Sequence, residues 1–270
     1  MRSTRARAPR SSHTRPHPSL RSPQAAFQGK LECVRLLLDA GAEIEAKGGF
    51  YDSTPLFQAA EMGHVEVCRL LVARGAKLNA PSNKGSTAVH VAAWRGRLEA
   101  IRFLLDAGAE AREGSAGDHS QTPLHMAIIH GKADVARELA RRLGPEALSV
   151  RAEFDLKAVH FAALYGQVEV MRFLLDECRV SVEEPGGKTE STPLYQACEK
   201  GHCAVAAELV ARGARINAKS KHGATVCARA AEAATARCPF SPRSLSLSRS
   251  FIAAFHCGAE RPRIRRGADA

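Results

Sequence analysis

Histidine and cysteine are the residues of this sequence whose types and spacing could support chemistry. Six of the eleven histidines recur at fixed places in a repeated segment, and these are His64, His90, His125, His130, His160 and His202. A metal or catalytic site needs histidines that converge with carboxylates or with a nucleophile. A recurrence every 33–35 residues spreads the imidazole rings along the molecule instead. We therefore predict that these histidines form structural hydrogen bonds and hold no metal.

The eight cysteines are even in number, as they would be in a disulfide framework. Four of them occupy places that other copies of the repeat fill with small apolar residues: Cys33, Cys68, Cys198 and Cys203. No C-x-x-C pair occurs, and the group formed by Cys198, His202 and Cys203 is too small for a zinc site. We predict buried thiols in a reducing compartment, and hence an intracellular, cytoplasmic protein, with the nucleus as the alternative.

Motifs of catalysis and cofactor binding are incomplete or missing. Gly187-Lys188-Thr189 matches the end of a phosphate-binding loop, but Val182 stands where the full pattern needs a glycine. This tripeptide is expected in a turn before Thr192. The sequence has no H-E-x-x-H, no G-x-S-x-G and no dinucleotide-binding glycine pattern. We predict a protein that is not an enzyme and binds no cofactor.

The net charge of +11 over 270 residues comes from the two ends of the chain. Residues 1–26 contain six Arg and no acidic residue, and residues 233–270 contain seven Arg with Glu260 and Asp269. The 26 basic and 26 acidic residues that are left make the middle neutral. Apolar runs are only a few residues long, against the roughly 18 that a membrane span needs, so we predict no transmembrane segment.

Both ends lack an apolar period and are rich in Arg, Ser and Pro, so we predict disorder over residues 1–24 and a low-complexity tail over 233–270. The tail contains Ala253-Ala-Phe-His-Cys-Gly, which looks like a degraded repeat fragment. Three interpretations of the ends stay open: an organelle transit peptide, Arg-rich arms for nuclear import or phosphate binding, and a low-complexity extension without a role. We favour the third.

The middle of the chain consists of one sequence segment that repeats several times. Thr54-Pro-Leu-Phe-Gln-Ala-Ala-Glu-Met-Gly-His returns in related forms from Thr87, Thr122, Lys157 and Thr192, with a partial copy from Thr225. Thr and Pro suit the cap and first turn of a helix, and a glycine suits its end. A second apolar pattern with helical spacing follows, as in Val65, Cys68, Leu71 and Val72. One such helix pair cannot bury its apolar face alone, so the copies must stack.

With this motif the chain resembles the ankyrin repeat family over residues 25–232, with partial first and last repeats. The resemblance implies an all-α solenoid of stacked helix pairs with short β-hairpin fingers, and a protein-binding groove formed by the fingers and the first helices. The copy that starts at Lys157 lacks the Thr-Pro pair and so loses its helix cap, which costs about 1 kcal/mol. We expect the array to open locally between residues 135–142 and 158–165.

The residues that the repeat does not dictate predict the binding surface. If the implied geometry holds, the last residues of the first helices line the groove, and the fingertips add to them. The predicted partner-binding residues are Phe50, Tyr51, Met62, Asn83, Lys84, Trp94, Arg95, Ile129, His130, Leu164, Tyr165 and Lys200. Trp, Tyr and Arg are the residue types that most often anchor protein interfaces.

We therefore predict a non-enzymatic protein–protein interaction module or adaptor that binds a partner protein through the groove. One alternative is salt-sensitive binding of nucleic acid or an anionic surface by the Arg-rich ends. The other is a fragment of a larger multidomain protein. The neutral middle argues against nucleic acid as a partner of the repeats themselves.

Overall fold

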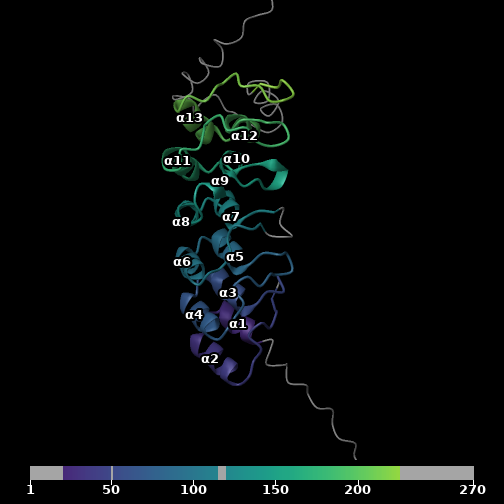
Figure 1. Ribbon diagram of the computed structural model, residues 1–270, viewed down its shortest axis with the longest axis vertical. Coiled ribbons are helices and arrows are strands. Elements are labelled where there is room, and N and C mark those ends of the chain that lie inside the picture. Colours follow the sequence, from purple (N-terminus) through teal and green to yellow (C-terminus); the bar gives the residue numbers. More distant parts are fainter. Residues whose placement is uncertain (1–20, 50, 115–119, 226–270) are drawn as a thin grey trace, which may run out of the picture.

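The computed structural model describes residues 21–49, 51–114 and 120–225, which form a stack of paired short helices (Figure 1). The first helices of the pairs are α1 (Arg21–Phe27), α3 (Pro55–Met62), α5 (Ala88–Arg95), α7 (Pro123–Ile129), α10 (Ala158–Leu164) and α12 (Pro193–Lys200). The second helices are α2 (Leu31–Asp39), α4 (Val65–Ala73), α6 (Leu98–Asp106), α8 (Ala133–Leu143), α11 (Val168–Asp176) and α13 (Cys203–Ala211). The predicted all-α solenoid is confirmed.

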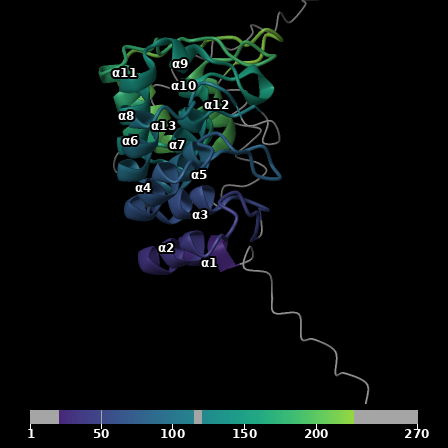
Figure 2. The same ribbon diagram turned by 60° about the horizontal axis from the view of Figure 1, so that its bottom comes forward.

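First helices pack on first helices and second helices on second helices, so the stack has two layers (Figures 1 and 2). Small residues allow the close approach between the layers. Ala59 and Ala60 of α3 are fully buried, and Ala92 and Ala93 of α5 occupy the same places one repeat later. Large aliphatic side chains of the second helices fill the space between repeats, among them Leu71, Leu104, Leu139 and Leu174.

Threonine, proline and glycine delimit the first helices as the sequence predicts. The Thr54 hydroxyl accepts a hydrogen bond from the Phe57 N–H at 3.4 Å, and Pro55 occupies the first turn. The threonines before α7 and α12 form the same cap. Gly63 ends α3 with a φ of +83°, a conformation that other residues resist.

Histidine completes two of these caps, which confirms its predicted structural role there. Nδ1 of His125 accepts a hydrogen bond from the Thr122 N–H at 3.3 Å and lies 2.9 Å from the Thr122 hydroxyl oxygen. His90 and Thr87 repeat this geometry before α5. Burial lowers the pKa of His125 to about 4, so the ring is neutral at physiological pH.

One hydrogen bond between neighbouring repeats recurs at the turn inside four of the helix pairs. Nε2 of His202 lies 2.9 Å from the Leu164 carbonyl oxygen, and its ring covers Gly166, where a Cβ would stand 2.6 Å from Nδ1. Gln167 donates to the Ile129 carbonyl at 3.0 Å. The turn residues His64 and Arg97 bond to the preceding repeat in the same way. These turns therefore link the repeats directly.

The fingers project from one side of the stack and pair with each other. Isolated antiparallel bridges join Gly48 to Ser53, Gly186 to Ser191 and Lys219 to Thr225, and within the described residues no longer strand forms. Neighbouring fingers are joined by backbone hydrogen bonds of 2.8–3.0 Å, from Asn83 to Tyr51, from Gly187 to Asp155 and from Lys221 to Thr189. These bonds join the fingers before α3 and α5 to each other, and likewise the fingers from Asp155 onward.

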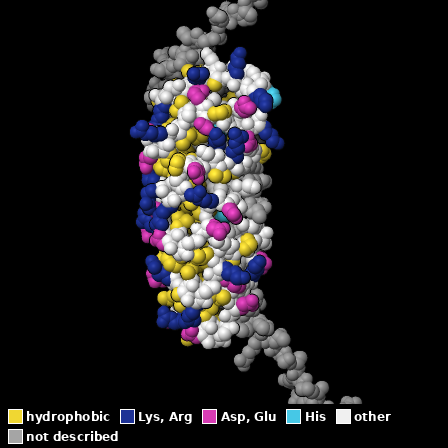
Figure 3. Space-filling view, in the orientation of Figure 1, with side chains coloured by type: hydrophobic (Ala, Val, Ile, Leu, Met, Phe, Trp, Pro, Cys, Tyr) yellow, Lys and Arg dark blue, Asp and Glu magenta, His cyan; other side chains and the backbone are white. Residues whose placement is uncertain are grey.

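The second helices carry a ladder of ion pairs on their outer face (Figure 3). Arg137 pairs with Asp134 of its own helix at 3.2 Å and with Glu177 after α11 at 3.0 Å. Arg102 and Arg172 make equivalent pairs within and between repeats. Exposed pairs of this kind contribute about 0–1 kcal/mol each. Their main consequence is that these arginines are already neutralised by neighbouring acids.

Two predicted features need correction. Cys33 and Cys203 are exposed, although we expected buried thiols. Cys33 lies on α2, which has a described repeat on one side only, and Cys203 is the first residue of α13. Cys68 is buried as expected, and burial raises its pKa to about 12. Helix α1 begins at Arg21, inside the segment predicted to be disordered, and buries Pro23.

The link between α8 and α10 is irregular, as its sequence suggested. It contains the short helix α9 (Glu146–Ser149) and a 3-10 turn (Glu153–Asp155) in which Phe154 has a φ of +59°. Lys157 precedes α10 without a side-chain cap. The rest of both predicted ends, and the partial copy after Thr225, lie outside the described residues. No helix in the described ranges is long and apolar enough to cross a membrane.

Candidate functional site on the finger face

The face formed by the fingers and the first helices is called the finger face below. The predicted row of groove residues stands there at the C-terminal ends of the first helices. Met62, Trp94 and Leu164 are half-buried, and Tyr165 is 43% exposed. Ile129 differs, because it is only 9% exposed and packs into the core. Its neighbour His130 is the exposed residue of that repeat.

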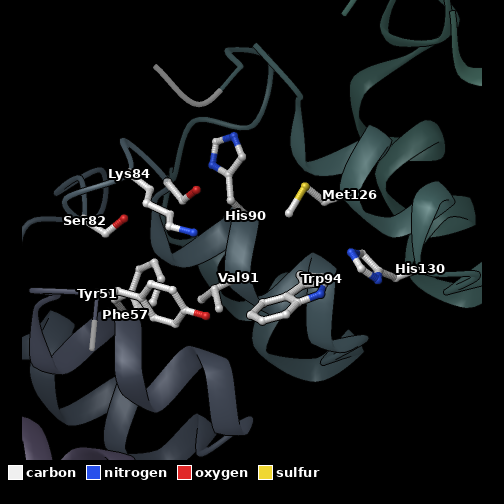
Figure 4. Close-up of a pocket in the computed structure, with 10 residues that line it drawn as sticks. Tyr51, Phe57, Ser82, Lys84, His90, Val91, Trp94, Met126 and His130 are labelled. Atoms are coloured by element: carbon white, nitrogen blue, oxygen red, sulfur yellow. The ribbon is translucent and has the colours of Figure 1, made fainter. Parts of the chain in front are cut away.

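A pocket of about 290 Å³ opens between two fingers and the helices α3, α5 and α7 (Figure 4). Tyr51 and Lys84 reach it from neighbouring fingers, Trp94 from α5, and His130 from the end of α7. All four are predicted binding residues. The remaining lining residues are Phe57, Ser82, Ser86, His90, Val91 and Met126. We call this site the Tyr51–Trp94 pocket.

Ring contacts hold the side chains of the Tyr51–Trp94 pocket. The rings of Tyr51 and Phe57 have centroids 6.2 Å apart, and Nζ of Lys84 lies 5.5 Å from the Tyr51 ring. On the other side, Trp94 and His130 have centroids 5.8 Å apart. A cation near an aromatic face is attracted by the ring quadrupole. The pocket walls are therefore positioned before any partner arrives.

Arg95 connects the Tyr51–Trp94 pocket to the preceding repeat. Its guanidinium carbon lies 4.0 Å from the Trp94 ring, and its Nη2 lies 2.6 Å from the carboxylate of Glu61, which is 7% exposed on its side chain. Burial and the charges of Lys132 and Arg95 lower the pKa of the nearby His130. Arg95 and Glu61 therefore neutralise each other at the Trp94 end of the pocket.

A second pocket of about 630 Å³ lies further along the finger face. Among the predicted residues it contains Leu164, Tyr165 and Lys200. The Tyr165 ring stacks on Phe161, with centroids 6.5 Å apart. Phe154 is 63% exposed on the finger beside it, and Lys188 also lines the pocket. We call this site the Phe154–Tyr165 pocket.

Other predicted residues lie outside both pockets. Met62 lines neither of them, and Asn83 uses its backbone N–H to join two fingers. Phe50 lies outside the described residues. Sequence reasoning missed Val91 and Met126 in the Tyr51–Trp94 pocket. A usable signal existed, because each precedes a predicted groove residue by three or four positions, which is one helical turn.

The residues considered above for phosphate or metal binding lie in structural positions. Gly187-Lys188-Thr189 lies in the finger closed by Gly186 and Ser191, as expected. His160 packs with its Nε2 2.8 Å from the Glu184 carbonyl oxygen. No group of three or more His, Cys, Asp or Glu residues suited to a metal ion occurs in the described ranges.

Comparison with known proteins identifies the repeated unit. The sequence pattern of a family described as ankyrin repeats (3 copies) matches residues 24–115, 81–148, 110–184 and 144–220. A solved structure, the human ASB11 ankyrin repeat domain, superimposes with a TM-score of 0.66 at 22% identity. It covers 82% of this chain and 99% of that domain, and so supports the fold.

Several curated proteins are similar over parts of their length. Human ankyrin repeat and SOCS box protein 16 is 39% identical over 125 residues, which are 43% of this chain and 27% of that protein. Human B-cell lymphoma 3 protein is 40% identical over 111 residues, or 41% of this chain and 24% of that protein. Poly(ADP-ribose) polymerase tankyrase of Caenorhabditis elegans is 28% identical over 185 residues, which are 62% of this chain and 8% of that protein. The matches thus span about a quarter or less of these relatives.

Proposed function

The chain belongs to the ankyrin repeat family, and we propose that it is a non-catalytic adaptor that binds a partner protein through its finger face. The ankyrin repeat fold is a protein–protein interaction module, and the proposal assigns that role to a particular surface of this chain. The observation that carries it is the Tyr51–Trp94 pocket, in which two half-exposed aromatic residues from a finger and from α5 face a common space (Figure 4).

The composition of this surface supports a role in protein binding. Trp, Tyr and Arg dominate the energetics of protein interfaces, and Tyr51, Trp94 and Arg95 occur together here. The Phe154–Tyr165 pocket supplies a second group of exposed aromatic side chains along the same face. An extended partner segment or an exposed loop can contact both pockets in succession.

Rigidity of the finger face supports the proposal as well. Tyr51 is fixed through the hydrogen bond that its carbonyl accepts from Asn83, and Trp94 is held between Arg95 and His130. Ordering a side chain on binding costs about 0.5–1.5 kcal/mol, so anchors that are already positioned favour affinity. The stacked helices therefore present the anchors at little entropic cost.

The test is quantitative capture of proteins from native lysate with matched variants of the full chain. Trp94→Ala combined with Tyr165→Ala removes one anchor from each pocket. Arg69→Ala combined with Phe103→Ala is the control. The guanidinium carbon of Arg69 on α4 lies 4.9 Å from the Phe103 ring on α6, a cation–aromatic contact like that of Arg95 with Trp94 but between second helices. We expect partners that the wild type and the control retain and that the Trp94/Tyr165 variant loses.

Two results would contradict the proposal. In the first, capture is unaffected by the Trp94/Tyr165 substitutions but is lost with the control pair, which would move the interface to the outer face. In the second, capture requires residues 1–24 or 233–270 and disappears as salt is raised. That result would favour binding of anionic molecules by the Arg-rich ends.

A further inference from the structure

We propose that the partner segment in the Tyr51–Trp94 pocket is acidic, with an apolar side chain inside the pocket and carboxylates beside Lys84 and Lys132. The proposal rests on the function proposed above and adds the chemistry of the partner. It follows from three features of the pocket: its apolar interior, the positive charge around it, and the engagement of the nearby acid.

The interior of the pocket is suited to an apolar side chain. Val91 and Phe57 are buried in its floor, and Tyr51, Trp94 and Met126 stand around it half-buried (Figure 4). Burial of an apolar side chain in such a space gains about 25 cal/mol for each Å² removed from water. The volume of about 290 Å³ accommodates one large aliphatic or aromatic side chain.

Positive charge surrounds this interior. Lys84 extends over the Tyr51 ring, and Arg95 covers Trp94 on the opposite side. The Lys132 side chain lies over Gly96 at the end of α5, where an added Cβ would be 2.8 Å from its Cδ. Lys84 and Lys132 form no ion pair with any described residue. These two ammonium groups are available to a partner.

Glu61 does not neutralise the two lysines, because it is already paired with Arg95. Among the described residues that line the pocket, none is acidic. Glu61, at the preceding repeat, is held by Arg95 at 2.6 Å and is shielded from solvent. On the outer face the arginines have acidic partners in their own and the next repeat. The finger face near this pocket therefore attracts negative charge in a way that the outer face does not.

An acidic protein segment fits these features better than nucleic acid. Nucleic acid binding relies on a succession of Lys and Arg contacts to phosphates. Here the repeats carry equal numbers of acidic and basic residues, and the available cations flank an apolar pocket. Complementary charge around an apolar anchor is the usual arrangement of a specific protein interface.

The experiment is selection of peptides from a phage-displayed random dodecapeptide library on the immobilised full chain. Wild type is compared with Lys84→Glu, Trp94→Ala and Lys30→Glu. The last makes the same charge change at the start of α2, outside the pocket, and exposed charges more than about 8 Å apart are largely screened at physiological salt. Dissociation constants of a selected peptide are then measured by fluorescence anisotropy, with circular dichroism to verify folding.

We expect wild type to enrich peptides with an aromatic or aliphatic residue next to Asp or Glu. Lys84→Glu should weaken such a peptide about tenfold, equivalent to about 1.4 kcal/mol, and should shift new selections toward Lys and Arg. Lys30→Glu should leave the affinity of the peptide and the composition of the selected peptides unchanged. Trp94→Ala should abolish the enrichment of any such peptide. If Trp94→Ala unfolds the protein, Tyr51→Ala takes its place.

The outcomes separate this inference from the proposed function. Peptides that depend on Trp94 but contain no excess of acid, or that ignore Lys84→Glu, overturn the inference and leave the proposed function standing. Peptides that bind the Trp94→Ala variant equally well contradict the proposed function too. Failure of wild type to enrich any peptide overturns the inference, since the pocket is already formed. Competition by a twenty-nucleotide oligodeoxythymidine, lost in Lys84→Glu, overturns it in favour of nucleic acid.

Discussion

At the scale of single residues, the position before α10 differs from its counterparts. The hydroxyl oxygens of Thr87 and Thr122 lie 2.9 Å from the Nδ1 atoms of His90 and His125, within hydrogen-bond distance. Lys157 has no hydroxyl, and Nδ1 of His160 is buried without a hydrogen bond in the described part of the chain. The Lys157 ammonium instead pairs with Glu184 of the neighbouring finger. Without that hydroxyl α10 has no side-chain cap, which costs about 1 kcal/mol, so this site is a local weakness.

A substitution at Lys157 tests this weakness. Lys157→Thr and Lys157→Ala both remove the ion pair with Glu184, and only the threonine supplies a hydroxyl to His160 and to the free N–H groups of α10. We expect Lys157→Thr to be more stable than Lys157→Ala by about 1 kcal/mol. Urea unfolding followed by circular dichroism measures the difference. Equal stability of the two variants would show that the hydroxyl is not used.

At the scale of elements, the α8–α10 link interrupts an otherwise regular connection. Before α3 and α12 a finger with a short backbone bridge leads to a capped helix, whereas here α9 and a 3-10 turn intervene and α10 has no side-chain cap. Regions with fewer stabilising contacts open more often than their surroundings. The link is therefore the place where the stack is expected to open.

Hydrogen exchange measures this opening directly. We expect the backbone amides of residues 158–165 to exchange faster than those of residues 88–95 in α5, which occupies the same place in its repeat and has the Thr87–His90 cap. Mass spectrometry of the native protein provides the comparison. Equal protection of the two segments would remove the idea of a weak junction.

At the scale of the whole molecule, the stack is quasi-one-dimensional, because the described helices pack mainly on helices of their own and adjacent repeats. A weak junction then divides it into two unequal parts. The described part after the junction contains two complete helix pairs, fewer than the roughly three repeats that such arrays need for stability. We infer that this part is the less stable one.

Unfolding followed by two probes tests this division. Trp94 is the single tryptophan and lies before the junction in α5, so its fluorescence reports that part alone, while circular dichroism reports all helices. We expect a first loss of ellipticity in urea that leaves Trp94 fluorescence unchanged. Coincident curves would mean that the array unfolds as one unit despite the irregular link.

The sequence alone determined the repeated helix pair, its caps and its stacking. These depend on local chemistry, such as Thr-Pro at a helix start and glycine at its end, and on an apolar period that repeats with the unit. The row of groove residues followed from the same period, which is why Trp94, Leu164 and Tyr165 were placed on the face where the structure has them.

Tertiary structure alone decided which of these residues meet and how exposed they are. The Tyr51–Trp94 pocket combines residues from two fingers and three helices, and no sequence spacing encodes that meeting. Ile129 is buried and Cys33 exposed because exposure depends on what the neighbouring repeats cover. The pairing of Glu61 with Arg95, which leaves Glu61 unable to neutralise Lys84 and Lys132, likewise arises from contacts between repeats.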